Sequence, residues 1–193
     1  MMIVKVKARP PGQYLITLAQ AKDQLNIETS FTGKDTMLTA LLGVTTDHIE
    51  NHTGRYLIEQ TLDCLCERWE EVCGVLPFGY FQSVSEITYW DSDGVFQTVS
   101  ASDYYVSDVG TDDGRITFKD SFSYPDLYEY AEHPITLTIV VGYPKTVGDD
   151  YQANIPEPLK FAARLYLEHL YDSSDVENAV NALLASYRSW RHP

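Results

Sequence analysis

Long apolar segments are missing from this sequence of 193 residues. No run approaches the roughly 20 apolar residues that a membrane-spanning helix requires. The segment up to Pro11 alternates apolar and basic side chains, so it lacks the continuous apolar stretch of a secretion signal. We therefore expect a protein that is made in the cytoplasm and that does not enter a membrane.

Cysteine is scarce as well, with only Cys64, Cys66 and Cys73. An odd number of cysteines without the spacing of a disulfide framework indicates a reducing compartment. The three thiols are conceivable as part of a zinc site, but such sites more often use Cys-x-x-Cys turns and need a fourth ligand. We interpret these cysteines as small buried apolar side chains.

Positive charge is low, because 14 Lys and Arg stand against 28 Asp and Glu and give a net charge of −14. Non-specific binding of nucleic acid requires clustered Lys and Arg, so this chain should repel DNA. Ten of the acids lie between Asp91 and Glu132, whereas both ends of the chain carry basic residues. This polarity suits subunits that stack head to tail, although the same acids would also simply keep a protein soluble.

Catalytic signatures are lacking too: there is no glycine-rich phosphate loop, no Gly-x-Ser-x-Gly elbow and no nucleophile–base pair. The acidic turns 91–94 and 108–114 resemble fragments of calcium loops, but neither has a glycine at the sixth position together with a glutamate at the twelfth. His48 and His52 could share a metal ion, yet no glutamate directly follows His48 as in zinc proteases. We predict an exposed, non-ligating histidine pair, no metal or cofactor and no enzyme. A metal-dependent hydrolase built on the histidines and cysteines is an alternative.

Helical signals lie near both ends of the chain. A capping-box pattern, Thr17 to Gln20, predicts a helix over 17–27. A second helix is predicted from Asp35 to Gly54, because glycine readily takes the conformation that follows a helix end. Its predicted inward-facing residues are Leu38, Leu41, Leu42, Thr45 and Ile49.

A third helix is predicted after Pro156, which suits a first helical position. Phe161 and Leu165 give this helix a second apolar edge, so we expect it to be buried on more than one side. A fourth helix from Val176 carries apolar residues on one face to the end of the chain. The four helices are expected to form a small bundle.

Between the helical segments the period of the sequence changes to two, which is the spacing of strands. Residues 84–90 and 95–99 predict a hairpin around a turn at 91–94, and further strands are predicted over 104–106, 115–118 and 135–141. The predicted fold class is therefore α+β, a small helical bundle from the N- and C-terminal helices with an inserted, mostly antiparallel β region.

The predicted organisation is one structural domain with three parts. An N-terminal arm and helices occupy 1–56, the β-rich lobe occupies 57–143, and the C-terminal helices occupy 144–193. Eight of the 14 tyrosines lie between Tyr80 and Tyr143. Tyrosine is enriched at protein interfaces, although aromatic residues also favour strands for reasons of packing.

Several segments occur in an order that resembles one protein family. They are 15–27 as an opening helix, 49–57 with Thr-Gly-Arg at a helix end, 76–77, 83–89, 103–106, 142–143 and 155–160. Over most of the chain this order is similar to the head–tail connector, or adaptor, family of long-tailed bacteriophages, whose members are often called DNA-packaging proteins. The alanine-poor second helix and the three cysteines depart from the family's pattern.

The resemblance implies a structural subunit of the virion, located at the head–tail junction and synthesised in the host bacterial cytoplasm. It implies a ring, commonly of twelve copies, beneath the portal protein. Such a ring would contact the portal and a head-closure or tail protein, and it would conduct the passing DNA without binding it specifically. Catalytic residues are not required.

Two sets of candidate residues follow. The candidates for acids that face the lumen of the ring are Asp108, Asp112 and Asp113. The candidates for contact with a partner protein lie at the C-terminal end of the chain and are Tyr187, Arg188, Trp190 and Arg191. The alternatives are a neck or tail-completion subunit, a DNA-packaging factor that acts only during assembly, and a stand-alone binding module that uses the β lobe.

Overall fold

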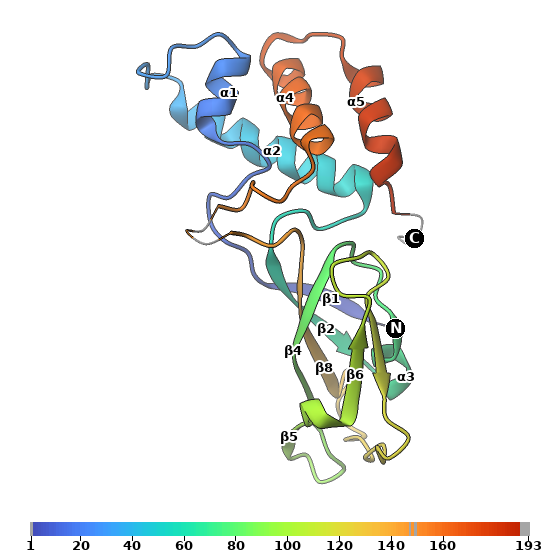
Figure 1. Cartoon of the computed structure of the whole chain (residues 1–193). Helices are drawn as coiled ribbons and strands as arrows, with labels where there is room; N and C mark the ends of the chain where they lie inside the picture. Colours follow the sequence, from blue (N-terminus) through green and yellow to red (C-terminus); the bar gives the residue numbers. More distant parts are fainter. Residues whose placement is uncertain (1, 147, 149, 190–193) are drawn as a thin grey trace. The chain divides into compact units, whose positions relative to one another are not determined.

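In the computed structural model of this chain, the described residues are 2–146, 148 and 150–189. The chain divides into two compact units (Figure 1), a β unit of Met1–Arg9 with Glu59–Gly142 and a helical unit of Pro10–Ile58 with Tyr143–Pro193. Each unit is therefore built from two separate segments of the sequence. The helices and antiparallel sheets confirm the predicted α+β class, whereas the predicted three-part division of the chain stays a prediction.

The β unit contains two antiparallel sheets. The larger sheet has the strand order β1 (Ile3–Ala8), β2 (Gln60–Cys66), β8 (Ile135–Val141), β4 (Phe81–Trp90) and β5 (Phe96–Thr98). The smaller sheet has the order β3 (Gly74–Val75), β7 (Arg115–Phe118) and β6 (Tyr104–Ser107). The short helices α3 (Trp69–Val72) and η1 (Ala101–Asp103) complete the unit. Residues 3–8, part of the N-terminal arm expected from sequence, form strand β1 and pair with β2.

One face of the larger sheet forms a hydrophobic core. Along β2 the side chains of Leu62, Cys64 and Cys66 have no exposed surface, whereas the intervening residues are half-buried. Strand β8 alternates in a similar way, with Leu137 and Ile139 fully buried. Burial of each large aliphatic side chain stabilises the fold by about 1.5–3 kcal/mol relative to exposure.

The opposite face of the same sheet carries a charged row. Lys7 of β1 lies 3.3 Å from Asp63 of β2 and donates hydrogen bonds of 3.3 Å to Glu86 of β4 and Thr138 of β8. Burial opposes the charged form of Lys7, but the bonds to Glu86 and Asp63 outweigh it and raise the pKa of Lys7. The row thus connects four neighbouring strands through one cation.

Trp69 is the centre of an aromatic cluster in the β unit. Its ring centroid lies 5.2 Å from that of Tyr89, 5.7 Å from that of Phe118 and 5.6 Å from that of Phe122, with the rings steeply inclined. The indole N–H donates a hydrogen bond of 3.0 Å to the carbonyl of Pro125. Inclined aromatic pairs are favourable beyond their burial, so this cluster stabilises the contact of α3 with β4 and β7.

The predicted hairpin is confirmed as β4 and β5. Asp91 Oδ1 accepts the N–H groups of Asp93 at 3.1 Å and Val95 at 2.9 Å, and Gly94 adopts a φ of 74° that favours glycine. Asp91 Oδ2 accepts a bond of 2.8 Å from the Gln97 amide. These bonds, that of Gln97 above all, lower the pKa of Asp91, so the carboxylate holds the turn in its ionised form.

Among its described residues, the helical unit contains four α-helices. They are α1 (Leu18–Gln24), α2 (Asp35–Thr53), α4 (Glu157–Asp172) and α5 (Glu177–Leu184), and the 3-10 helix η2 (Ala185–Tyr187) follows α5. Within the described ranges, no helix is both long and apolar enough to cross a membrane.

Local sequence signals set several helix ends. The N–H of Gln20 donates to Thr17 Oγ1 at 3.2 Å and the N–H of Thr17 donates to Gln20 Oε1 at 2.9 Å, which confirms the capping box. Gly54 ends α2 as predicted, with a φ of 65°. Pro156 lies at the N-cap of α4 rather than at a first helical position, because its ψ of 136° is extended.

The last helix is shorter than predicted. Helix α5 ends at Leu184, and η2 continues only to Tyr187. Arg188 is extended, and the N–H of Ser189 donates a bond of 2.7 Å to the carbonyl of Thr53 at the end of α2. This long-range bond is incompatible with continued helix.

A buried carboxylate fixes the place where the chain leaves the helical unit. Glu50 is 8% exposed, and its Oε1 accepts the N–H groups of Leu57 at 2.8 Å and Ile58 at 3.3 Å. Ile58 also forms a parallel bridge with Tyr143, whose N–H donates to the carbonyl of Leu57 at 3.0 Å. The departing and the returning segments are therefore bonded to each other inside the helical unit.

Lys22 of α1 is almost completely buried, with 3% of its surface exposed. Its Nζ donates to the carbonyls of Thr29 at 3.1 Å and Phe31 at 2.9 Å and lies 2.6 Å from Asp35 Oδ1. A buried ammonium group needs such partners, because burial of an unpaired charge is costly. Lys22 thereby fixes the connection between α1 and the start of α2.

Replacement of this lysine should destabilise the protein strongly. The substitution Lys22→Met keeps the length of the side chain but leaves two carbonyls and Asp35 without their donor, so the free energy of unfolding should fall by about 3 kcal/mol. Urea denaturation measures this change. Lys5→Met on the exposed strand β1 is the matched control and should change stability by less than about 0.5 kcal/mol; equal effects of the two substitutions would contradict the assigned role of Lys22.

Candidate assembly surfaces

The three candidate lumen acids lie together on the loop between β6 and β7. Asp108 and Asp113 are exposed and Asp112 is half-buried. Asp108 adopts a φ of 56°, a left-handed conformation that aspartate tolerates better than most residues. The structure brings the three acids together, and their orientation toward a lumen stays a prediction.

The backbone of this acidic loop is anchored on strand β4. The N–H of Phe81 donates to the carbonyl of Thr111 at 3.0 Å, and the N–H of Gly110 donates to the carbonyl of Phe81 at 2.8 Å. A Cβ at Gly114 would lie 2.4 Å from the Phe81 side chain, so only glycine allows this close approach. The loop therefore presents its carboxylates from a defined backbone.

The candidate partner contact at the C-terminal end is described only in part. Tyr187 is half-buried in η2 and Arg188 is exposed. Trp190 and Arg191 lie outside the described residues. The bond from Ser189 to Thr53 holds this end of the chain against α2.

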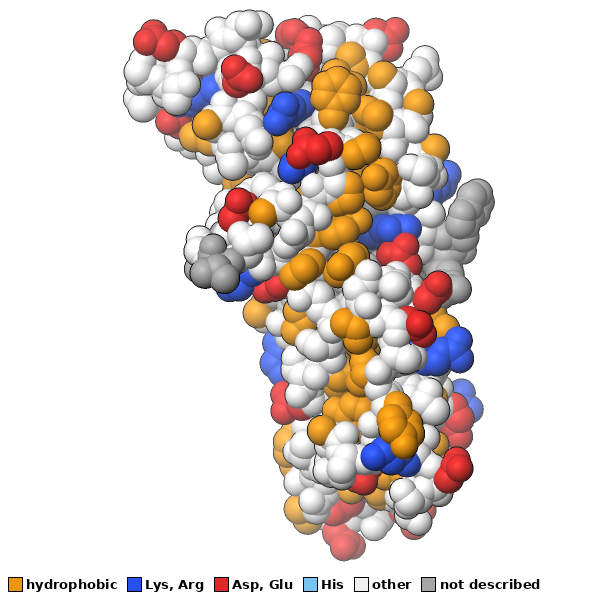
Figure 2. Space-filling model, in the orientation of Figure 1, with side chains coloured by type: hydrophobic (Ala, Val, Ile, Leu, Met, Phe, Trp, Pro, Cys, Tyr) orange, Lys and Arg blue, Asp and Glu red, His pale blue; other side chains and the backbone are white. Residues whose placement is uncertain are grey.

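Two helices of the helical unit expose apolar side chains. Met37 and Val44, two turns apart on α2, are 44% and 52% exposed, and Phe161 on α4 is 48% exposed. Figure 2 shows a strip of hydrophobic side chains over the part of this unit that carries α4 and α5. The expectation that α4 is buried on its Phe161 edge is therefore wrong, and Leu41 of α2, expected inside, is only half-buried.

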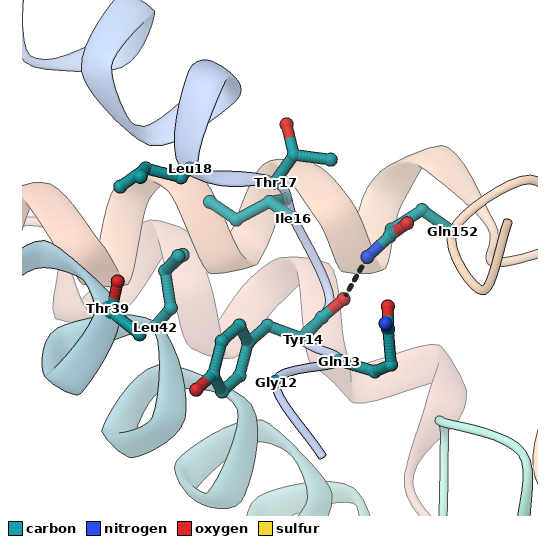
Figure 3. A pocket seen from close by; sticks show the side chains of 9 residues that line it. All are labelled: Gly12, Gln13, Tyr14, Ile16, Thr17, Leu18, Thr39, Leu42 and Gln152. Carbon is teal, nitrogen blue, oxygen red and sulfur yellow. Dashed lines mark hydrogen bonds between the residues drawn. The ribbon is translucent and has the colours of Figure 1, made fainter. Parts of the chain in front are cut away.

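A groove of about 270 Å³ lies between the segment before α1 and helix α2 (Figure 3). It is lined by Gly12, Gln13, Tyr14, Ile16, Thr17, Leu18, Thr39, Leu42 and Gln152. Ile16 and Leu42 are almost fully buried, and the Gln152 amide donates a bond of 2.7 Å to the carbonyl of Tyr14. The lining contains no His, Cys, Asp, Glu, Lys or Arg, so the groove suits an apolar side chain better than acid–base chemistry.

His48, one of the two histidines of α2, packs against α4. His48 stacks on Tyr166 with ring centroids 3.9 Å apart and an angle of 7°, and its centroid lies 6.1 Å from that of His52. Both histidines are half-buried, so the prediction of an exposed pair is wrong. Burial, followed by the nearby His52, lowers the pKa of His48 and outweighs the opposing charge of Glu177; His169 adds to the lowering.

Cys64 and Cys66 are buried as predicted, whereas Cys73 is only half-buried, so the prediction is wrong for that residue. Burial raises the pKa of the Cys64 and Cys66 thiols to about 12. Such thiols are protonated and unreactive at neutral pH. In the part of the chain that the structure describes, no group of three His, Cys, Asp or Glu side chains could hold a metal ion.

Sequence reasoning missed the groove, the exposed face of α2 and the buried partners of Lys22 and Glu50. The groove combines residues from the segment before α1, from α2 and from the loop before α4, and no local pattern predicts that combination. The α2 face had a local signal, because Met37 and Val44 are seven residues apart in a helix that carries a second apolar stripe.

Comparisons with known proteins find similarity in structure. No protein-family model matches the chain, and no curated protein matches it in sequence. A chain of the solved structure "Neck of empty GTA particle computed with C6 symmetry" is similar over 99% of this chain and 97% of that chain, with a TM-score of 0.75 and 19% identity.

Two further solved structures give the same result. They are "Virion of native gene transfer agent (GTA) particle", with a TM-score of 0.75, and "Neck of native GTA particle computed with C12 symmetry", with a TM-score of 0.74. Each is 18% identical over 99% of this chain and 97% of that chain. At these identities the likeness shows a shared fold.

The histidine stack gives a pH-dependent prediction. Because the pKa of His48 is lower in the folded protein than its ordinary 6.5, the unfolded chain binds more protons at acidic pH. The contribution of neutral His48 to the free energy of unfolding is complete above about pH 7. It is lost as the pH falls through 6.5 toward the lower pKa that His48 has in the folded protein. Denaturation between pH 5 and 8 should show a smaller loss of stability at acidic pH for His48→Gln than for the unchanged protein. His133→Gln, in the β unit, is the control, and an equal change with this variant would refute the assignment.

Proposed function

We propose that this chain is a structural, non-enzymatic subunit of the neck of a tailed phage or phage-like particle. In this role it forms a ring beneath the portal and connects the head to the tail. The observation that carries the proposal is the likeness of fold, over 99% of this chain, to chains of gene transfer agent structures, two of which are necks computed with C6 and C12 symmetry. The order of sequence segments that resembles phage connectors supports the same role independently.

A ring requires heterologous interfaces, in which one surface of a subunit meets a different surface of the next. The helical unit offers two unlike apolar surfaces, one with Met37 and Val44 on α2 and one with Phe161 on α4. We infer that the helical unit packs subunit against subunit and onto the portal, which would bury these side chains. Tyr187 and Arg188, with Trp190 and Arg191 beyond the described residues, are the proposed contact with the portal or with a tail-side protein.

The acidic loop would serve the passage of DNA. Acids that face a lumen repel the phosphate backbone, so DNA would pass without adhering to the ring. The loop is suited to this role because Asp108 and Asp113 are exposed on a backbone that is anchored to Phe81.

Native mass spectrometry of the purified protein, alone and with the portal ring of the same particle, tests the proposed function. We expect a closed oligomer near twelve copies, or uptake of a full ring when portal is present, and no bound metal. Template-dependent closure is physically reasonable, because a portal ring raises the effective concentration of docked subunits. A protein that stays monomeric and does not bind portal, or that carries stoichiometric zinc, would refute the proposal.

Neutralisation of the acidic loop tests the proposed lumen. The triple variant Asp108→Asn, Asp112→Asn, Asp113→Asn should slow genome ejection at least about tenfold if each carboxylate repels phosphate, as measured by DNA release from particles. A control triple variant, Asp23→Asn, Glu28→Gln, Asp175→Asn, makes the same change in net charge, from −14 to −11 when three carboxylates are neutralised. Unchanged ejection with the loop variant, or equal slowing with the control, would refute the proposal that these acids face the lumen.

A further inference from the structure

One end of the β unit exposes a group of large apolar side chains that no core explains. Trp90, Val95 and Phe96 on the β4–β5 hairpin are 43%, 52% and 55% exposed, and Tyr130 on the loop before β8 is 83% exposed. These four residues are called the tip patch below. Aromatic side chains of this size contribute strongly to binding energy when a partner covers them.

The tip patch is held in place by a network of backbone hydrogen bonds. The N–H of Trp90 donates to the carbonyl of Pro134 at 2.9 Å, and the N–H of Tyr128 donates to the carbonyl of Trp90 at 3.1 Å. Asp91 forms an antiparallel bridge with Leu127, so the loop lies beside the hairpin. The patch is therefore organised before any partner arrives, which lowers the entropy cost of binding.

The rings within the tip patch also contact one another or their neighbours. Trp90 and Phe96 have centroids 5.3 Å apart and are inclined at 65°, and Tyr128 and Tyr130 are 5.5 Å apart and inclined at 67°. A Cβ at Gly94 would lie 3.2 Å from the Tyr128 ring, so the turn packs closely on the loop. Faces and edges of several rings remain open to a ligand.

The charge around the tip patch has one sign. Residues 89–98 and 120–132 contain six acids and no Lys or Arg; the acids are Asp91, Asp93, Asp120, Asp126, Glu129 and Glu132. Figure 2 shows acidic and hydrophobic side chains together at the end of the β unit that carries the hairpin. Exposed aromatic rings among carboxylates are complementary to cationic side chains, which stack on the rings and pair with the acids.

Four of the 14 cations of this chain are already engaged by its own residues. Lys7 is paired with Asp63 and Glu86, and Lys119 lies over the Tyr105 ring at 4.8 Å. Lys22 is buried, and Lys160 is paired with Glu157. A second copy of this chain carries a net charge of −14, so charge repulsion would oppose its approach to this acidic surface, and a basic segment of a different protein is the better complement.

We propose that the tip patch is a docking surface for a segment of another protein in which arginine or lysine side chains alternate with apolar ones. The cations stack on Trp90, Phe96 and Tyr130 and pair with the surrounding acids, while the apolar residues cover Val95. Nucleic acid does not fit this surface, because phosphate is repelled by the same acids. The inference rests on the β unit alone and does not depend on the proposed ring.

A peptide-binding experiment with the full chain tests this surface. The probe is a capped peptide of four Arg-Leu-Ser repeats with a photo-crosslinking group, and its counterpart has neutral citrulline in place of each arginine. At physiological salt we expect the arginine peptide to bind at least about tenfold more tightly than the citrulline peptide, with crosslinks confined to residues 89–98 and 124–132. Crosslinks spread over the whole acidic surface would overturn the proposal.

Two variants separate specific docking from general attraction to an acidic protein. Phe96→Thr with Tyr130→Ser keeps the net charge and should weaken binding of the arginine peptide about tenfold, because two ring contacts are lost. The triple variant Asp23→Asn, Glu28→Gln, Asp175→Asn lowers the negative charge elsewhere and should change binding by less than about twofold. Unchanged binding of the arginine peptide by the double variant would overturn the proposal. Loss of the protein's own oligomers in the double variant would also overturn it, because the tip patch would then be a contact with a second copy of this chain.

Discussion

A single buried carboxylate, that of Glu50, holds the last residues of the helical unit before the chain leaves it. Glu50 accepts two backbone N–H groups at the point where the polypeptide leaves the helical unit, and the returning segment at Tyr143 is bonded to the same stretch. The departing and the returning segments are thereby tied together inside the helical unit. A buried acceptor of this kind must stay hydrogen-bonded, since a lost partner costs more than the bond itself contributes.

The sequence could predict those parts of the fold that depend on neighbouring residues. The capping box at Thr17, the glycine that ends α2 and the turn at Asp91 each involve atoms within a few residues, so their patterns carry the necessary information. The end of α5 could not be predicted, because it depends on a bond to Thr53 that lies far away in the chain. The burial of Lys22 and the exposure of Phe161 are decided in the same way by packing in three dimensions.

The candidate surfaces also differ in whether neighbouring residues or distant segments form them. The acids of the β6–β7 loop are clustered in sequence, and reading them as one group required no structure. The tip patch required it, because the hairpin and the loop that carries Tyr130 are distant in sequence and are joined by tertiary contacts such as the bridge between Asp91 and Leu127. Surfaces of assembly proteins are often composed in this way from separate segments, and composition alone then indicates their chemistry but not their location.

The pairing of β1 with β2 has a consequence for the order of events during synthesis. The larger sheet needs its first strand from the start of the chain and its central strand, β8, from residues that emerge much later. Sheets that pair distant segments form slowly, because the chain must close long loops before the contacts are gained. On the ribosome neither unit can be completed until the chain has been made as far as the segment that returns at Tyr143, so a shorter nascent chain would contain neither unit in finished form. Chain connectivity would thus make the two units complete at nearly the same stage of synthesis.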